Sequence, residues 1–179
     1  MGFFGALRGS EYLTPSASAY SPRRTCLRRH VTTDNDALTL TIPASKTDQT
    51  GKGHVVTLPR LQGSACPVRA MDRYLAYTGH LPADLPLFTL ASGSYATISW
   101  LNNLLKTNLC SASGKLTTHS LRIGFATAAA ATGTPNQTIQ ASGRWQGHTY
   151  ASYIRGPRLD VRRACLAIDA AHRRDRRSH

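Results

Sequence analysis

The chain has 179 residues, which is enough for one domain with a substantial hydrophobic core. Its 22 lysines and arginines outnumber its 9 aspartates and glutamates and give a formal net charge of +13. Arginine, whose planar fork matches phosphate oxygens, supplies 18 of the 22 cations. Together with the motifs described below, this charge favours a nucleic-acid partner over a generally basic, ribosomal-type protein. No apolar run approaches the roughly 20 residues of a membrane helix, which excludes a protein with such a span. The four cysteines form no Cys-x-x-Cys pair and are predicted to be reduced thiols.

The first part of the chain predicts a helix, a loop and a hairpin. Residues 2–11 form an apolar segment that ends in polar residues, as in a helix. The Ser-, Pro- and Arg-rich stretch 12–30 predicts a loop whose arginines either touch nucleic acid or form a solvated face. Strict alternation over residues 37–42 predicts a strand, residues 54–58 predict a second, and the glycine-containing segment between them predicts a hairpin loop.

Two helices are predicted in the middle of the chain. One begins at Pro67, which suits a first helical position, and runs to about Tyr77, shortly before Gly79. The other runs over about 98–109 after a Thr97 cap. Apolar residues at helical spacing predict that one face of this second helix is buried, and these residues are Trp100, Leu101, Leu104 and Leu105.

The last part of the chain predicts three more helices and a basic tail. Helices over about 120–132 and 135–142 are joined by a tight turn at Gly133. Such a pair resembles a helix-turn-helix, which would bind DNA without any enzymatic activity. A final helix is predicted over 159–171, and the arginine-rich tail 173–179 either binds phosphates, serves nuclear import or is simply solvated. The whole pattern predicts the α+β class, mostly helical with a small antiparallel sheet.

The residues with catalytic potential form short motifs in the last third of the chain. His119 and Arg122 are three residues apart and share one helix face. The triplet Gly143-Arg144-Trp145 follows, and Tyr153 begins the run Tyr-Ile-Arg eight residues after the tryptophan. Arginine binds phosphate oxygens, histidine transfers a proton near neutral pH, and tyrosine can act as a covalent nucleophile. Together these groups are able to attack a phosphodiester without a metal.

This set of motifs resembles the catalytic domain of the tyrosine recombinases, the phage-integrase-like enzymes that exchange DNA strands. It is most similar to the recombinases of DIRS-like retroelements and cryptons. The segment Leu7-Arg8-Gly9-Ser10-Glu11 resembles the family's first arginine box, and Ser45-Lys46-Thr47-Asp48 resembles its hairpin lysine box. The resemblance covers residues 2 to about 170. It implies a mostly helical catalytic domain over residues 1–172, without the N-terminal DNA-clamping domain that the family normally carries, followed by the basic tail.

The resemblance implies phosphate-binding roles for several residues. Arg8 and Arg122 would bind the oxygens of one scissile phosphate and offset the charge that grows in the transition state. Glu11, the only glutamate of the chain, would hold the guanidinium of Arg8. Trp145 would donate its indole N–H to the phosphate. Two further arginines would add DNA contacts, and these are Arg144 and Arg155.

The implied chemistry needs no metal, no cofactor and no ATP. Tyr153 would attack phosphorus and become a 3′-phosphotyrosine, and His119 would either assist proton transfer at the tyrosine or orient the phosphate. Tyr150 is a nearby rival that lacks the Tyr-Ile-Arg wording. Lys46 would protonate the departing 5′-oxygen, and Lys52 is the rival for that role. The site residues are therefore expected to lie around one basic pocket, although they span most of the chain. They are Arg8, Lys46, His119, Arg122, Trp145 and Tyr153.

The implied activity is DNA strand cleavage and rejoining in the recombination or integration of a mobile element. Its implied partners are double-stranded DNA and further copies of the chain, assembled as a tetramer on DNA, with no membrane. The expected location is the nucleus in a eukaryote, and the cytoplasm or nucleoid otherwise. Two alternatives stay open: an inactive DNA-binding remnant of a recombinase, and a type IB topoisomerase-like enzyme that relaxes DNA by the same chemistry.

We predict that the chain binds double-stranded DNA with weak sequence selectivity and strong salt dependence, because each phosphate contact releases counterions. With about six or more phosphate contacts, affinity should fall by about 10³-fold or more between about 50 and about 200 mM salt in a fluorescence-anisotropy titration. An affinity that stays flat over this range contradicts a DNA partner.

Overall fold

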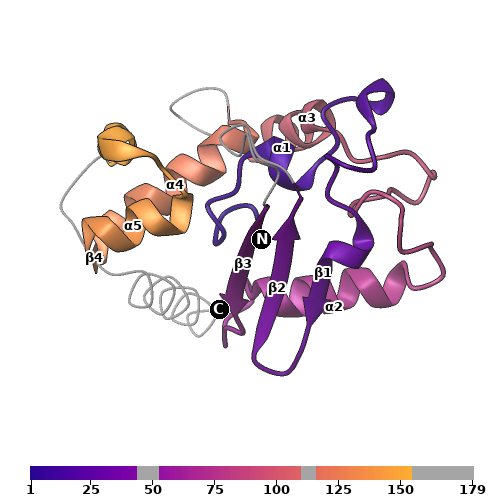
Figure 1. Cartoon of the computed structure of the whole chain (residues 1–179), viewed down its shortest axis with the longest axis horizontal. Coiled ribbons are helices and arrows are strands. Elements are labelled where there is room, and N and C mark those ends of the chain that lie inside the picture. The colour runs from indigo at the N-terminus through magenta and orange to yellow at the C-terminus, as the bar shows by residue number, and fades with distance from the viewer. Residues whose placement is uncertain (44–52, 110–115, 155–179) are drawn as a thin grey trace.

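The computed structural model of the chain describes residues 1–43, 53–109 and 116–154. Within these ranges a small three-stranded sheet lies beside a group of helices, and a short helix near the N-terminus lies between the two parts (Figure 1). This arrangement belongs to the α+β class, as the sequence predicts. The helix expected over 159–171 and the basic tail lie outside the described residues.

The sheet consists of β1 (Val31–Thr33), β2 (Ala37–Ile42) and β3 (His54–Pro59), which pair antiparallel in that order. The alternation along β2 confirms the predicted strand, because every second side chain points into the core. The fully buried residues of β2 are Leu38, Leu40 and Ile42. The sequence did not predict β1, because three residues are too few to show an alternating pattern.

The helix α2 (Pro67–Tyr77) packs against all three strands and has the bounds that the sequence predicts (Figure 1). Its first turn is capped by the thiol of Cys66, whose Sγ accepts a hydrogen bond from the backbone N–H of Arg69 at 3.5 Å. Pro67 follows the cap, where a missing N–H costs nothing. Val68 and Met71 on the inner face of α2 join the buried residues of β2 in a first hydrophobic cluster.

The helix α3 (Ile98–Asn108) begins at the predicted cap, where the hydroxyl of Thr97 accepts from the backbone N–H of Trp100 at 3.1 Å. The predicted buried stripe is wrong for Trp100 and Leu104, whereas Leu101 and Leu105 are partly buried and Leu101 packs against the first cluster. Trp100 is 39% exposed and Leu104 is 42% exposed, and no residue of α3 is fully buried. Helical spacing identifies an apolar face, but it does not show whether another element covers that face.

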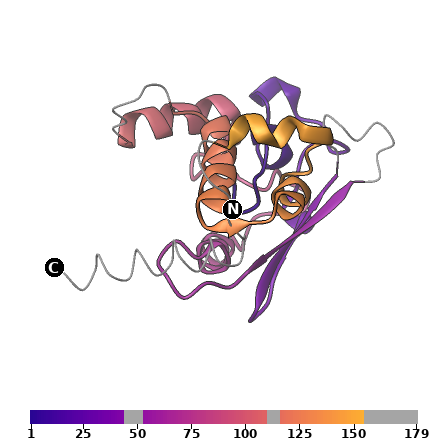
Figure 2. The ribbon, with the colours of Figure 1, turned by 90° about the vertical axis from the view of Figure 1, so that its left-hand side faces the viewer.

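A second hydrophobic cluster holds α4 (Thr118–Ala131), α5 (Asn136–Gly143) and the 3₁₀ helix η3 (Gly147–Tyr153) together. The two helices predicted on either side of Gly133 are confirmed, with bounds shifted by one or two residues. The inner face of α4 is rich in alanine, whose small side chain lets α5 and η3 approach closely (Figure 2). The buried members of this cluster are Ala6, Phe125, Ala126, Ala129, Ala130, Ile139, Trp145 and Tyr150.

The N-terminal segment connects the two clusters. The helix predicted over residues 2–11 is wrong in its extent, because residues 2–6 form turns and α1 covers only Gly9–Tyr12. Ala6 has a left-handed backbone, with φ 44°, which ends any helix that begins before it. Ala6 packs into the second cluster while its neighbour Leu7 packs into the first.

The described residues contain no helix that is both long and apolar enough to cross a membrane. They also contain no group of three or more histidine, cysteine or acidic side chains arranged to hold a metal. Cys26 and Cys66 are free, buried thiols, as the sequence predicts, whereas Cys110 and Cys165 lie outside the described residues. Burial raises the pKa of the Cys26 thiol to about 12, so this group is unreactive at neutral pH.

We predict that Leu40→Ala lowers the free energy of unfolding by about 2–5 kcal/mol, because Leu40 is fully buried and truncation leaves a cavity. The measurement is urea unfolding followed by circular dichroism. Val55→Ala in the same sheet is the control, because Val55 is 66% exposed and its truncation should change the free energy by less than about 0.5 kcal/mol. Equal losses for the two variants would show that β2 does not carry the core.

Candidate active site

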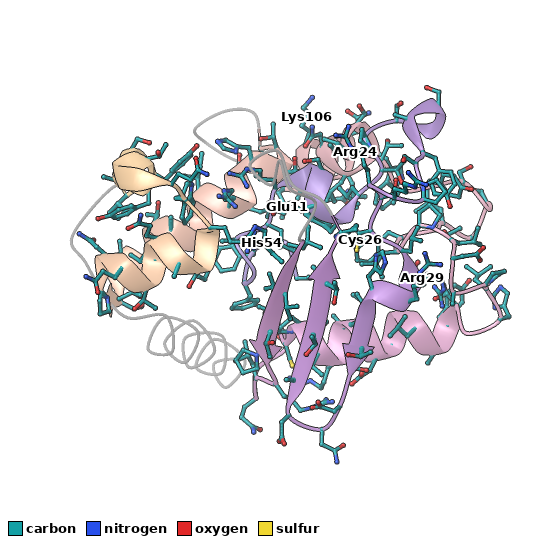
Figure 3. All side chains as sticks on the ribbon, viewed as in Figure 1. Glu11, Arg24, Cys26, Arg29, His54 and Lys106 are labelled. Atoms are coloured by element: carbon teal, nitrogen blue, oxygen red, sulfur yellow. The ribbon has the colours of Figure 1, made fainter. Side chains whose placement is uncertain are left out.

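A buried carboxylate lies at the centre of the site. Glu11 on α1 is 1% exposed, and its Oε1 accepts a hydrogen bond from Nη1 of Arg8 at 2.9 Å. Its Oε2 accepts from the backbone N–H of Arg8 and from Nη2 of Arg144, both at 2.8 Å. Figure 3 shows Glu11 on α1, between the sheet and the helical group. Because a buried carboxylate needs partners, Glu11 holds two cations side by side that lie far apart in the sequence.

The turn Gly143-Arg144-Trp145 closes α5 and folds the chain back on itself. Arg144 has a left-handed backbone, with φ 54°. The N–H groups of Arg144 and Trp145 donate to the carbonyls of Ala141 and Gln140, each at 3.0 Å, which satisfies two carbonyls at the helix end. The Trp145 ring then lies directly against Gly143, where an added Cβ would meet Cζ3 of the ring at 1.8 Å. Only glycine therefore fits at position 143.

The guanidinium of Arg122 is buried beneath this turn. Arg122 is 1% exposed, and its Nη1 and Nη2 donate to the backbone carbonyls of Ala6 and Gly143. Its Cζ lies 4.2 Å from the centroid of the Trp145 ring, a cation–π contact. Burial, followed by the charge of Arg8, lowers the pKa of Arg122 to about 10, so the side chain remains a cation at neutral pH.

Tyr153 lies at the end of η3, half-buried beside Trp145 and His119. The centroid of its ring is 5.5 Å from that of Trp145 and 5.4 Å from that of His119. Its backbone carbonyl accepts from the hydroxyl of Thr127 at 3.0 Å, which attaches η3 to α4. The phenol of Tyr153 thus lies between the imidazole of His119 and the ring of Trp145, and that ring also contacts the Arg122 guanidinium.

His119 stands in the first turn of α4, next to these groups. Partial burial lowers its pKa from the ordinary value of 6.5, and the positive charges of Arg122 and Arg8 lower it further. A histidine with a lowered pKa is neutral at pH 7, and a neutral imidazole can accept a proton. Burial and the two arginines therefore keep the imidazole of His119 neutral, with one ring nitrogen able to accept a hydrogen bond or a proton.

The expected site residues that fall within the described ranges all come together. They are Arg8, Glu11, His119, Arg122, Arg144, Trp145 and Tyr153. The two candidate lysines, Lys46 and Lys52, lie outside the described residues, as does Arg155. The rival tyrosine, Tyr150, is 6% exposed and packs in the second hydrophobic cluster.

Sequence reasoning missed the part of the site that is made of backbone. The carbonyl of Ala6 accepts from Arg122 and also from Nη2 of Arg144 at 3.4 Å. Ala6 and Arg144 are the two residues other than glycine with a positive φ in the described part of the chain, and both lie here. The sequence carries no signal for a backbone carbonyl that binds an arginine. It indicates unusual backbone here only through the glycine that precedes each residue, Gly5 and Gly143.

In comparisons with known proteins, no family model matches the sequence and no curated protein matches it at a significant level.

We predict that Gly143→Ala displaces the Trp145 ring from the Arg122 guanidinium, because the new Cβ and the ring cannot occupy the same space. Trp145 emission, measured with Trp100→Phe as background, should shift to the red as the ring becomes more exposed. The unfolding free energy should fall by about 1–3 kcal/mol, as expected for overpacking.

The matched control is Gly79→Ala. Its added Cβ would lie 3.4 Å from the carbonyl oxygen of Leu75, an ordinary contact. The control should leave Trp145 emission unchanged. Identical spectra for the two variants would contradict the tight packing of Trp145 on Gly143.

Proposed function

We propose that the chain cuts and rejoins DNA strands as a tyrosine recombinase, and that it folds as a recombinase-like catalytic domain. Tyr153 forms a transient covalent bond to a DNA 3′-phosphate in this proposal. The bond energy of the DNA backbone is retained in that intermediate, so the reaction requires no ATP. Double-stranded DNA and further copies of the chain are the proposed partners.

The observation that carries the proposal is the packing of Tyr153 against His119 and Trp145, with the Arg122 cation on the same tryptophan. An ordinary tyrosine titrates near pH 10, so it reacts at neutral pH only beside cations and a proton acceptor. The cluster supplies both. Arg122 is the cation on Trp145, with Arg8 and Arg144 near enough to affect the pKa of Arg122, and His119 is the neutral acceptor. Charged side chains are rarely buried in a hydrophobic core that contributes to stability alone.

In the proposed step, Oη of Tyr153 attacks phosphorus while the bond from phosphorus to the 5′-oxygen breaks. The phenolic proton passes to the neutral imidazole of His119, and the 5′-oxygen takes a proton from a lysine, assigned to Lys46 by resemblance. Arg8 and Arg122 offset the negative charge that grows on the phosphate oxygens. The 5′-hydroxyl of a second DNA end reverses the step and rejoins the strand.

A second candidate, a DNA-binding protein without catalysis, is favoured by the burial of Arg122. Two of its five N–H donors already bind the carbonyls of Ala6 and Gly143, as in an arginine with a structural role. With the residue only 1% exposed, a phosphate reaches the remaining donors only when a neighbouring side chain moves. In this second candidate that movement does not occur, and the chain, with its net charge of +13, binds DNA without cutting it.

We predict a covalent protein–DNA species when the full chain is mixed with nicked duplex oligonucleotides of randomised sequence. The nick lets a short cleaved fragment diffuse away, so the intermediate accumulates, and the random pool removes the need to know the target. The species should appear on a denaturing gel in EDTA and without ATP. Tyr153→Phe should abolish it without weakening DNA binding, because only the nucleophilic oxygen is lost.

Tyr150→Phe is the matched control and should leave the covalent species intact, because Tyr150 is packed in the second hydrophobic cluster. If the covalent species survives in Tyr153→Phe and disappears in Tyr150→Phe, the nucleophile is Tyr150 and the assignment to Tyr153 is wrong. DNA binding without any covalent species in the unaltered chain would support the second candidate.

A further inference from the structure

The side chain of Arg144 points into the protein and not toward solvent. Nη2 donates to Oε2 of Glu11 at 2.8 Å, and Nη1 donates to the carbonyls of Ser142 at 3.1 Å and Gly5 at 3.3 Å. Nη2 also reaches the carbonyl of Ala6 at 3.4 Å. The side chain is 12% exposed. Both terminal nitrogens of this guanidinium are therefore engaged by the protein itself.

The backbone of Arg144 gives a second indication of an internal role. Its φ of 54° lies in the left-handed region, where glycine is the ordinary residue. An arginine at such a position is strained, and strain of this kind persists only where surrounding contacts hold it. The contacts that hold it are those of the guanidinium with Glu11 and with the carbonyls of residues 5 and 6.

These contacts extend from Arg144 to both proposed phosphate-binding arginines. Through Glu11, whose other oxygen binds Nη1 of Arg8 at 2.9 Å, Arg144 fixes the position of Arg8. Through the carbonyl of Ala6, which also accepts from Arg122, it fixes the backbone that holds Arg122. The sequence suggested that Arg144 contacts DNA, but its two terminal nitrogens face the interior.

We propose that Arg144 is a positioning residue that sets the geometry of Arg8 and Arg122 and contributes no phosphate contact of its own. Its consequence for catalysis rests on the proposed DNA cleavage. Its consequence for binding does not: an arginine that touches no phosphate releases no counterion. Removing it therefore leaves the number of phosphate contacts, and with it the salt dependence of DNA affinity, unchanged, while Arg8 and Arg122 lose the geometry that the covalent step needs.

The test compares four variants of the full chain in two measurements. Arg144→Gly removes the guanidinium and relieves the left-handed backbone, whereas Arg144→Lys keeps the charge on an ammonium that cannot span Glu11 and the carbonyls. Arg8→Ala removes a proposed phosphate contact. Arg60→Ala is the charge-matched control, because Arg60 pairs with Asp72 outside the site. The measurements are the salt slope of DNA affinity and the rate of the covalent step at saturating DNA.

Arg144→Gly should leave the salt slope unchanged and slow the covalent step by about tenfold to a hundredfold, since small misplacements of a site can cost up to about 10²-fold. Arg144→Lys should behave in the same way. Arg8→Ala should reduce the slope by about 0.9, the value for one lost contact. Arg60→Ala should change neither measurement. A slope that falls by about 0.9 in Arg144→Gly, or a full rate in Arg144→Lys, overturns the proposal.

A double-mutant cycle in the protein alone separates this proposal from the proposed function. Arg144→Gly and Glu11→Gln should destabilise the protein non-additively in urea unfolding, because each removes the same ion pair. If the unaltered chain forms no covalent species, the proposed function fails, and the cycle and the salt slope still decide the role of Arg144. Additive effects on stability overturn the proposal. If Arg144→Gly does not fold, Arg144→Lys takes its place in the measurements of the salt slope and of the covalent rate, with the same expected outcomes.

Discussion

The site depends on the ion pairs that the Glu11 carboxylate makes with Arg8 and Arg144. Glu11 is 1% exposed, and breaking a buried ion pair by removing one partner costs about 3–5 kcal/mol. The pairs fix the distance between α1 and the turn after α5, which no backbone connection brings together. A third cation, Arg122, lies beside them because the carbonyl of Ala6 binds it together with Arg144. One anion thus allows three arginines to share a small volume.

Backbone strain is concentrated at the same place. Ala6 and Arg144 have φ of 44° and 54°, conformations that cost a non-glycine residue of order 1–3 kcal/mol each. Elsewhere in the described chain glycine occupies the positive-φ positions. The left-handed turn at Ala6 belongs to a segment whose carbonyls accept from two guanidinium groups, and the turn at Arg144 returns Trp145 onto Gly143. The local rules of chain geometry are therefore broken only where the two arginines and the tryptophan must meet.

The sequence predicted the helices and strands well, but it predicted poorly which side chains face the interior. The period of β2 and the proline and glycine that bound α2 are local signals, and the structure confirms both elements. The exposed Trp100 of α3 and the inward side chain of Arg144 depend on what packs nearby. Arg144 finds its partner Glu11 133 positions away in the chain, a contact that no local pattern encodes. The chemical identity of the site residues was readable, and the backbone carbonyls that hold them were not.

Ala6 and Leu7 are neighbours in the chain, yet each belongs to a different hydrophobic cluster. Contacts of this segment reach residues near the other end of the described chain, and loop closure over such separations is entropically costly and slow in folding. Because Ala6 and Leu7 are buried members of the two clusters, neither cluster is complete until this segment has docked. A partly folded chain in which residues 5–7 have not docked would lack the carbonyls of Gly5 and Ala6, so the guanidinium groups of Arg122 and Arg144 would have no fixed position.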